Sequence, residues 1–319
     1  MAYYIGVDIG GTNIACGVVN DSCEVISRSK IKTNSIGNSL EYNDVLKVIK
    51  SAITSACEEA KINVNDAKSI GVGSPGTCNS ESGVVENCNN LRFDNSPIRD
   101  DLEKEFKIPV YLDNDANAAA YGEFVSGAAK GAKNAVVITL GTGVGAGIII
   151  DGKIYRGSNF AGGEIGHTVI AVDGAQCSCG RRGCFEAYSS ATGLVRMTLK
   201  AGEENPKSII NDIIKEDGRC SARTAYKAMK AGDPVGKAVT DEYVKYLACG
   251  ITNVINIFQP EVLCIGGGVC NEGEILLKPL KEAVAKQIYS KNSARNTEIV
   301  ICSLGNDAGI IGAAMLFKS

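Results

Sequence analysis

The chain contains a single histidine, His167, and three cysteines follow it within a short span. One imidazole and three thiolates form the complete donor set of a closed tetrahedral zinc site. A redox pair is the alternative, but Cys-x-Cys is a poor redox spacing compared with Cys-x-x-Cys. The sequence therefore predicts a structural zinc ion, because four protein ligands leave no open position for a reaction. The predicted ligands are His167, Cys177, Cys179 and Cys184.

Two glutamates lie close to these ligands along the chain. Glu164 precedes the histidine by three residues, which places both side chains on one side of a helical turn, and Glu186 follows the last cysteine by two. Zinc would hold one nitrogen of His167 and leave the other facing outward. Each glutamate could instead be an ordinary surface charge. Held rigidly, the two carboxylates and the imidazole would form a hydroxyl-binding set for a sugar.

Residues 8–13 read Asp-Ile-Gly-Gly-Thr-Asn and follow an apolar, β-prone stretch. Bare glycine amides can approach a phosphate closely, and Asp8 could hold magnesium through water. Such a turn can equally be an ordinary hairpin. However, a similar glycine turn returns at 141–145, and a third glycine run occupies 266–268, which favours three backbone approaches to one polyphosphate. The predicted nucleotide-binding residues are Asp8, Gly10, Gly11, Thr12, Asn13, Gly141, Thr142, Gly143, Gly266 and Gly267.

Residues 113–117, Asp-Asn-Asp-Ala-Asn, lie between a predicted strand and a predicted helix. Proteins of the α/β class present reactive groups at the carboxyl ends of strands, so Asp115 is the candidate general base. Alternatively, Asp113 or Asp115 only caps the helix. Four polar side chains in five positions exceed the need of one cap. We therefore expect at least two of them to face a ligand.

The elements that position these motifs follow from hydrophobic periodicity. We predict an antiparallel meander with strands at 3–8 and 14–19, then a helix at 39–60, a strand at 69–72, a helix at 97–106, a strand at 110–112 and a helix from 116. Strands at 135–140 and 146–150 flank the second glycine turn, so the opening pattern repeats. The rest is mostly helical, with helices at 234–258 and 272–289, a strand at 262–265, and a final helix at 307–317 that packs on the first domain.

The totals favour small-molecule chemistry. A length of 319 residues allows two domains with the site in a cleft between them. A net charge of −3, with no basic run, disfavours a nucleic-acid partner. No signal-peptide pattern and no apolar run of ~20 residues are present, so we expect no membrane contact and a cytoplasmic protein. Most of the 13 cysteines are expected to be reduced thiols in the core.

Six ordered motifs resemble those of the ROK family (repressors, open reading frames, kinases), and most of all its bacterial glucokinase branch. They lie at 8–12, 114–117, 140–143, 164–167, 177–186 and 305–309. The resemblance implies an α/β fold of the actin-like ATPase (ribonuclease H-like) type with duplicated topology, in which each of two domains has a mixed sheet flanked by helices. We expect a small domain, 1–118 plus 305–319, and a large domain, 119–304, with the zinc-binding segment 164–186.

The resemblance also implies roles for single residues. Asp115 matches the catalytic base of the family, and Gly76 would line the sugar pocket. The matching sugar-hydroxyl ligands are Asn114, Glu164, His167 and Glu186. The implied reaction is the phosphorylation of glucose at its 6-hydroxyl with ATP and Mg2+, carried out by a homodimer or homotetramer.

Other functions stay open at this point. Many family members carry a tryptophan soon after an Asn-Leu pair, whereas residues 90–93 read Asn-Leu-Arg-Phe and the chain has no tryptophan. Another hexose, such as fructose, N-acetylglucosamine or N-acetylmannosamine, is therefore an alternative substrate. A non-catalytic sugar sensor is the alternative from a different class, disfavoured by the intact Asp115 and by a kinase core that begins at Tyr3. A chaperone-like ATPase would have no use for the zinc-anchored sugar set.

Overall fold

The computed structural model describes residues 2–88 and 90–319. By its internal contacts the chain divides into two compact units. Unit 1 contains the residues up to Val137 together with Gly147–Gly163 and Cys302–Ser319, and unit 2 contains Ile138–Ala146 and Glu164–Ile301. The domain boundaries expected from the sequence, 118/119 and 304/305, stay a prediction.

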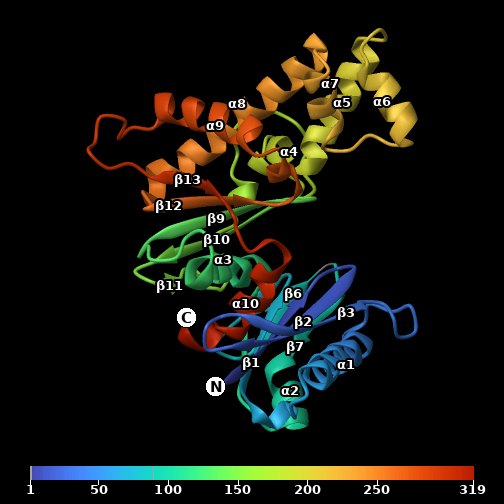
Figure 1. The fold of residues 1–319 in the computed structure, drawn as a ribbon, viewed down its shortest axis with the longest axis vertical. Coiled ribbons are helices and arrows are strands. Elements are labelled where there is room, and N and C mark those ends of the chain that lie inside the picture. The colour runs from blue at the N-terminus through green and yellow to red at the C-terminus, as the bar shows by residue number, and fades with distance from the viewer. Residues whose placement is uncertain (1, 89) are drawn as a thin grey trace. The chain divides into compact units, whose positions relative to one another are not determined.

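Two five-stranded sheets repeat one topology (Figure 1). The first has the order β3-β2-β1-β4-β8, in which β1, β2 and β3 form the predicted antiparallel meander and β4 and β8 run parallel to β1. The second has the order β11-β10-β9-β12-β13, with antiparallel and parallel neighbours. Counted along its own part of the chain, each sheet has the order 3-2-1-4-5. The predicted fold class, two mixed sheets of duplicated topology with flanking helices, is confirmed.

The strands of the first sheet are β1 (Tyr3–Ile9), β2 (Asn13–Asn20), β3 (Val25–Lys32), β4 (Ala67–Ser74) and β8 (Val110–Asn114). Those of the second are β9 (Ala135–Leu140), β10 (Val144–Ile150), β11 (Lys153–Ile154), β12 (Val262–Gly266) and β13 (Glu298–Ile301). A small third sheet, which the sequence analysis did not predict, is formed by β5 (Thr77–Asn79), β6 (Val84–Cys88) and β7 (Phe93–Ser96).

The helices agree with the predicted ones to within a few residues where a prediction was made. They are α1 (Tyr42–Ala60), α2 (Ile98–Phe106), α3 (Asp115–Ser126), α4 (Phe185–Ser189), α5 (Ala191–Glu204), α6 (Ile210–Asp217), α7 (Thr224–Lys230), α8 (Pro234–Phe258), α9 (Glu274–Gln287) and α10 (Ala308–Ala314). Among the described residues, no helix is both long and apolar enough to cross a membrane.

Alternation along β1 gives the first sheet two different faces. Ile5 and Val7 belong to the buried cluster that includes the apolar side of α1, and Gly6 between them points to the other face. There α10 approaches so closely that a Cβ on Gly6 would lie 1.9 Å from the carbonyl oxygen of Ile310. Figure 1 shows α10, in red, beside the blue N-terminal strands. The predicted packing of the last helix on the first domain is confirmed.

Candidate active site and metal site

Residues 113–117, here called the base turn, connect β8 to α3. The side-chain oxygen of Asn114 accepts hydrogen bonds from the backbone N–H groups of Ala116 (2.9 Å) and Asn117 (3.3 Å). The helix is therefore capped by Asn114, and not by Asp113 or Asp115 as the alternative interpretation proposed. Asp115 is the first residue of α3, and its Oδ1 accepts from the N–H of Ala116 at 2.9 Å. This hydrogen bond orients the carboxylate of the candidate base.

Gly76 lies next to the base turn, as the resemblance implied. The side-chain amide of Asn114 donates to the carbonyl oxygen of Gly76 at 3.1 Å. Gly76 has a φ of +95°, and a Cβ there would lie 2.1 Å from the carbonyl oxygen of Asn87. Only glycine fits this position, because both the backbone angle and the space exclude a side chain.

The two remaining polar residues of the base turn bond to each other. Asp113 is 1% exposed, and its Oδ1 accepts from the side-chain amide of Asn117 and from the N–H of Asn114, both at 2.8 Å. Its Oδ2 accepts from Nε of Arg156 at 2.7 Å. Asp113 and Asn117 therefore build the turn, and the prediction that at least two of its polar residues face a ligand now depends on Asn114 and Asp115.

Asp8 and Asp115 form a pair of neighbouring acids in unit 1. Burial, and then the negative charge of Asp115, raise the pKa of Asp8 to about 6. The motif at 305–309 makes room for this pair, since a Cβ on Gly309 would lie 2.5 Å from Oδ2 of Asp8. In the same motif, Asp307 accepts two hydrogen bonds from Arg28 of β3, at 2.9 and 2.7 Å.

The first glycine turn is held by hydrogen bonds to neighbouring residues, and one of its glycines is exposed. The N–H of Gly10 donates to the carbonyl oxygen of Asn13 at 2.9 Å. Thr33 supports the turn twice, through its N–H to Thr12 (3.0 Å) and its hydroxyl to Gly10 (2.7 Å). Gly11 is exposed and has nothing within 4 Å of an added Cβ. The sequence gives no local signal for the role of Thr33, because Thr33 follows β3 whereas the turn that it supports lies between β1 and β2.

The second glycine turn is tied to the segment that follows the cysteines. Glu186 accepts from the N–H of Val144 at 3.0 Å, and a Cβ on Gly143 would lie 2.3 Å from the same carboxylate oxygen. The hydroxyl of Thr192 donates to the carbonyl oxygen of Thr142 at 2.8 Å. Gly141 is exposed, and the N–H of Ala191 donates to its carbonyl oxygen at 2.9 Å.

The third glycine run lies beside this second turn. Gly266 ends β12 and is buried, whereas Gly267 is exposed with a φ of +97°. A Cβ on Gly267 would lie 2.3 Å from the carbonyl oxygen of Leu140, the residue before the second turn. Unit 2 thus brings together two of the three predicted phosphate-binding runs.

Residues 167–184, here called the cysteine loop, bring the four predicted zinc ligands together. Their donor atoms lie within 4.8 Å of one another. The sulfurs of Cys179 and Cys184 are 3.7 Å apart, and Nδ1 of His167 is 3.7 Å from the sulfur of Cys177. Tetrahedral zinc with Zn–S bonds of about 2.3 Å requires sulfurs about 3.8 Å apart. The donor set and its spacing fit a structural zinc ion.

The electrostatics of the cysteine loop are consistent with a bound cation. Burial raises the pKa of the Cys184 thiol to about 12, while the backbone N–H of Arg181 lowers the pKa of the exposed Cys179. Three thiolates cannot lie this close together without a neutralising charge. Metal binding would therefore release protons and hold the loop at the same time.

The predicted sugar ligands of unit 2 lie around this loop. Glu164 begins the short 3-10 helix Ile165–His167, and its carbonyl oxygen accepts from the N–H of His167 at 3.1 Å. Because Nδ1 of the imidazole faces the cysteines, Nε2 lies on the opposite side of the ring. Glu186 accepts from the hydroxyl of Ser178 at 3.2 Å, so one carboxylate contacts both the cysteine loop and the second glycine turn.

Phe93 occupies the region where many ROK members carry a tryptophan. It is 2% exposed and packs edge-on against Tyr42, with ring centroids 5.4 Å apart. Phe93 is therefore part of the core of unit 1, while its neighbour Arg92 is exposed and pairs with Glu41 at 2.8 Å.

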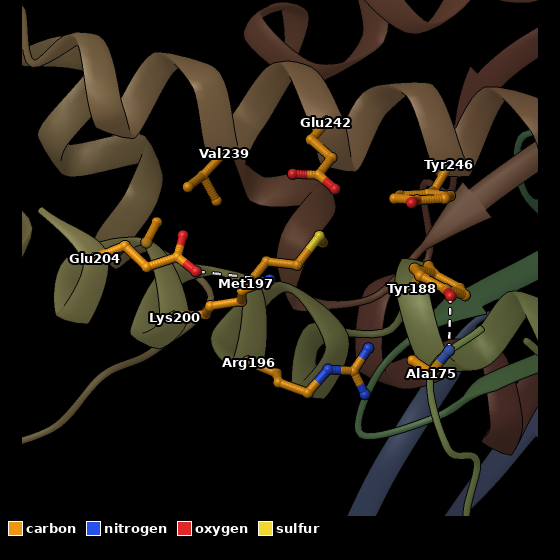
Figure 2. A pocket seen from close by; sticks show the side chains of 10 residues that line it. Ala175, Tyr188, Arg196, Met197, Lys200, Glu204, Val239, Glu242 and Tyr246 are labelled. Atoms are coloured by element: carbon orange, nitrogen blue, oxygen red, sulfur yellow. Dashed lines mark hydrogen bonds and ion pairs between the residues drawn. The ribbon is translucent and has the colours of Figure 1, made fainter. Parts of the chain in front are cut away.

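A cavity of about 340 Å³ in unit 2 is lined by Ala175 of the cysteine loop and by residues of α4, α5 and α8 (Figure 2). The rings of Tyr188 and Tyr246 stack on one side, 4.2 Å apart, and the hydroxyl of Tyr188 accepts from the N–H of Ala175 at 2.7 Å. None of its ten lining residues is a predicted site residue. Its charged side chains carry both signs, so the lining selects no class of ligand; they are Arg196, Lys200, Glu204 and Glu242.

Comparisons with known proteins assign the family. The ROK family model matches residues 4–319. The chain is 38% identical to a glucokinase of Halalkalibacterium halodurans over 99% of this chain and 95% of that protein. It is 30% identical to an N-acetyl-D-glucosamine kinase of Aliivibrio salmonicida over 98% of this chain and 99% of that protein.

A solved structure has the same fold. It is that of a ROK family glucokinase from Streptomyces griseus in complex with glucose and AMPPNP, with a TM-score of 0.82, 32% identity and 99% of each chain covered. The chain belongs to the ROK family.

Proposed function

We propose that the chain is an ATP-dependent sugar kinase that transfers the γ-phosphoryl group of ATP to the 6-hydroxyl of glucose. The observation that carries the proposal is the position of Asp115 at the carboxyl end of β8, with Asp8 beside it and Asn114 bonded to Gly76. The glucose and AMPPNP of the Streptomyces griseus structure support the choice of both substrates.

Asp115 is the proposed general base. It accepts the proton of the 6-hydroxyl as that oxygen attacks the γ-phosphoryl group in line. Asn114, Glu164, His167 and Glu186 bind the other sugar hydroxyls, and the three glycine runs bind the phosphates through backbone N–H groups. Positioning supplies most of the rate, because phosphoryl transfer asks for little covalent chemistry from the protein.

Two metal ions have different proposed roles. Asp8 would hold Mg2+ through water, and Mg2+ neutralises charge that develops on the phosphates. Zinc would be held by His167, Cys177, Cys179 and Cys184 and would fix the aim of the imidazole.

The test is ADP release measured with a panel of hexoses at matched concentrations. We expect glucose to give the highest kcat/KM with ATP. Formation of sugar phosphate, measured with polyphosphate in place of ATP, compares the two phosphoryl donors. The 30% identity to an N-acetyl-D-glucosamine kinase makes an N-acetylhexosamine the second candidate substrate. A higher kcat/KM with N-acetylglucosamine than with glucose would make N-acetylglucosamine the proposed substrate. Hexose binding seen by calorimetry without ADP release from any hexose would instead indicate a sensor. Light scattering measures the molar mass in solution and so tests the homodimer or homotetramer that the family resemblance implies.

A further inference from the structure

Asp113 is a buried carboxylate with one cationic partner, and the proposed reaction does not use it. Its side chain is 2% exposed, and that of Arg156 is 23% exposed. Arg156 donates from Nε to Asp113 at 2.7 Å and from Nη2 to the hydroxyl of Ser319, also at 2.7 Å. The guanidinium therefore joins the base turn to residue 319 within unit 1.

The backbone of Arg156 has a second structural role. Arg156 follows the short strand β11, and its carbonyl oxygen accepts from the N–H of Gly162 at 2.8 Å. This bond closes the loop 156–162, and two residues further along the chain is Glu164, a proposed sugar ligand. Arg156 thus contacts Asp113, two residues before the proposed base, and also begins the loop that leads to the proposed sugar ligand Glu164.

Stability alone is a poor reason for such a pair. Removing two charges from water costs about as much as their attraction returns, so a buried ion pair contributes little net stability. Its geometry is nevertheless rigid, because Arg156 makes two directed bonds and Asp113 accepts three. A displacement of about 1 Å at a reacting group can cost about 100-fold in rate.

We propose that Arg156 is a positioning residue for phosphoryl transfer: through Asp113 its side chain fixes Asn114 and Asp115, and the same side-chain bonds fix residue 156 itself, where the loop that leads to Glu164 begins. This inference rests on the proposed function, in which Asp115 is the base and Glu164 a sugar ligand. Arg156 itself need not touch either substrate.

The test compares Arg156→Met and Arg156→Lys in the full chain, with the best hexose of the panel. For Arg156→Met we expect kcat to fall about 10- to 100-fold and the hexose KM to rise, while the ATP KM stays within about twofold of the unchanged chain. Arg156→Lys should recover part of kcat, because an ammonium group neutralises Asp113 but cannot make both directed bonds.

Arg99→Met is the matched control. Arg99 holds the other end of the same strand, since it donates to the carbonyl oxygens of Val110 (3.1 Å) and Glu81 (2.8 Å). We expect this variant to lose thermal stability and keep its kcat. An equal loss of kcat in Arg99→Met would mean that general destabilisation explains the result, and the inference would be overturned.

Asp115→Asn separates this inference from the proposed function. If Asp115→Asn is inactive and a folded Arg156→Met keeps kcat and hexose KM, the positioning role is refuted and the proposed function stands. If Asp115→Asn binds hexose and keeps near-native turnover, both fail. Should Arg156→Met not fold, Arg156→Lys decides, and unchanged kcat and hexose KM in that variant would overturn the inference.

Discussion

The base turn of unit 1 and the cysteine loop of unit 2 hold proposed sugar ligands in two different ways. In the base turn, Asn114 caps α3, and the charge of Asp113 is neutralised by Arg156. In the cysteine loop, the cysteines would repel one another as thiolates, and burial raises the pKa of Cys184 to about 12, which favours its neutral thiol when no cation is bound. The charge of the base turn is therefore neutralised within the chain, whereas three thiolates in the cysteine loop would need a bound cation to neutralise them.

This difference has a functional meaning. Loss of the metal should disorder the cysteine loop without changing the fold around the base. Loss of the base should abolish proton transfer without changing the metal site. Variants and metal removal should therefore separate the two regions by which kinetic constant they change.

The largest effect is expected at the base turn. Asp115→Asn should lower kcat by about 10²- to 10⁴-fold, because the 6-hydroxyl loses its general base. Hexose affinity and zinc content should stay unchanged. ADP release and calorimetry measure these quantities, with the exposed Asp94→Asn as control. Near-native turnover with hexose bound would remove Asp115 from the mechanism.

The next largest effect is expected at the cysteine loop. Cys179→Ala should reduce bound zinc and raise the hexose KM by about tenfold or more, because zinc ligation fixes His167 and the neighbouring Glu186. The ATP KM should change less. Elemental analysis and kinetics check both expectations, and Cys249→Ala on α8 is the control. Protein purified without chelators that contains no zinc would contradict this assignment.

A smaller effect is expected where the cysteine loop meets the second glycine turn. Glu186→Gln removes the charge that accepts from Val144 and Ser178. We expect the KM values for hexose and ATP to rise together by about 3- to 10-fold, since one side chain serves both regions. Glu204→Gln on α5 is the control. A change in only one of the two KM values would show that Glu186 does not couple them.

The smallest effect concerns stability in unit 1. The folded pKa of Asp8 is about 6, above its ordinary value of 3.8, because of burial and then the charge of Asp115. The folded state therefore disfavours ionised Asp8, and this cost grows as the pH rises from about 4 to about 6. Asp8→Asn should increase the free energy of unfolding at pH 7.5 by on the order of 1 to 2 kcal/mol, and by much less at pH 4.

Urea unfolding without nucleotide or divalent cations measures this difference, and Asp94→Asn should show no such pH dependence. A gain in stability that is equal at both pH values would indicate that charge is not its cause.

Sequence patterns identified the motifs whose residues lie close together along the chain. The four zinc ligands fall within eighteen positions, and the structure places their donor atoms within 4.8 Å of one another. The strands that flank both glycine turns were predicted because period-2 alternation and glycine breaks are local signals. The small sheet of β5, β6 and β7 was missed, since its strands are short and contain many polar residues, and so show neither an apolar run nor an apolar–polar alternation.

The supporting residues could not be found in this way. Thr33 braces a turn that lies one strand away, and Arg156 reaches Asp113 across 43 positions. Each is a single polar residue without a recognisable spacing. Their partners are set by how the sheets fold, and hydrogen bonds between distant residues leave no periodic signal in the chain.

The sequence by itself determined which groups are available: one histidine beside three cysteines, an acid after a strand, and glycine turns whose bare backbone can approach a phosphate closely. Only the tertiary structure decided which of these groups build the site and which remain to bind. It assigned Asn114 as the helix cap and paired Asp113 with Arg156. The physical reason is that a side chain's type sets what it can bind, whereas burial and neighbouring charges set whether that capacity is already used.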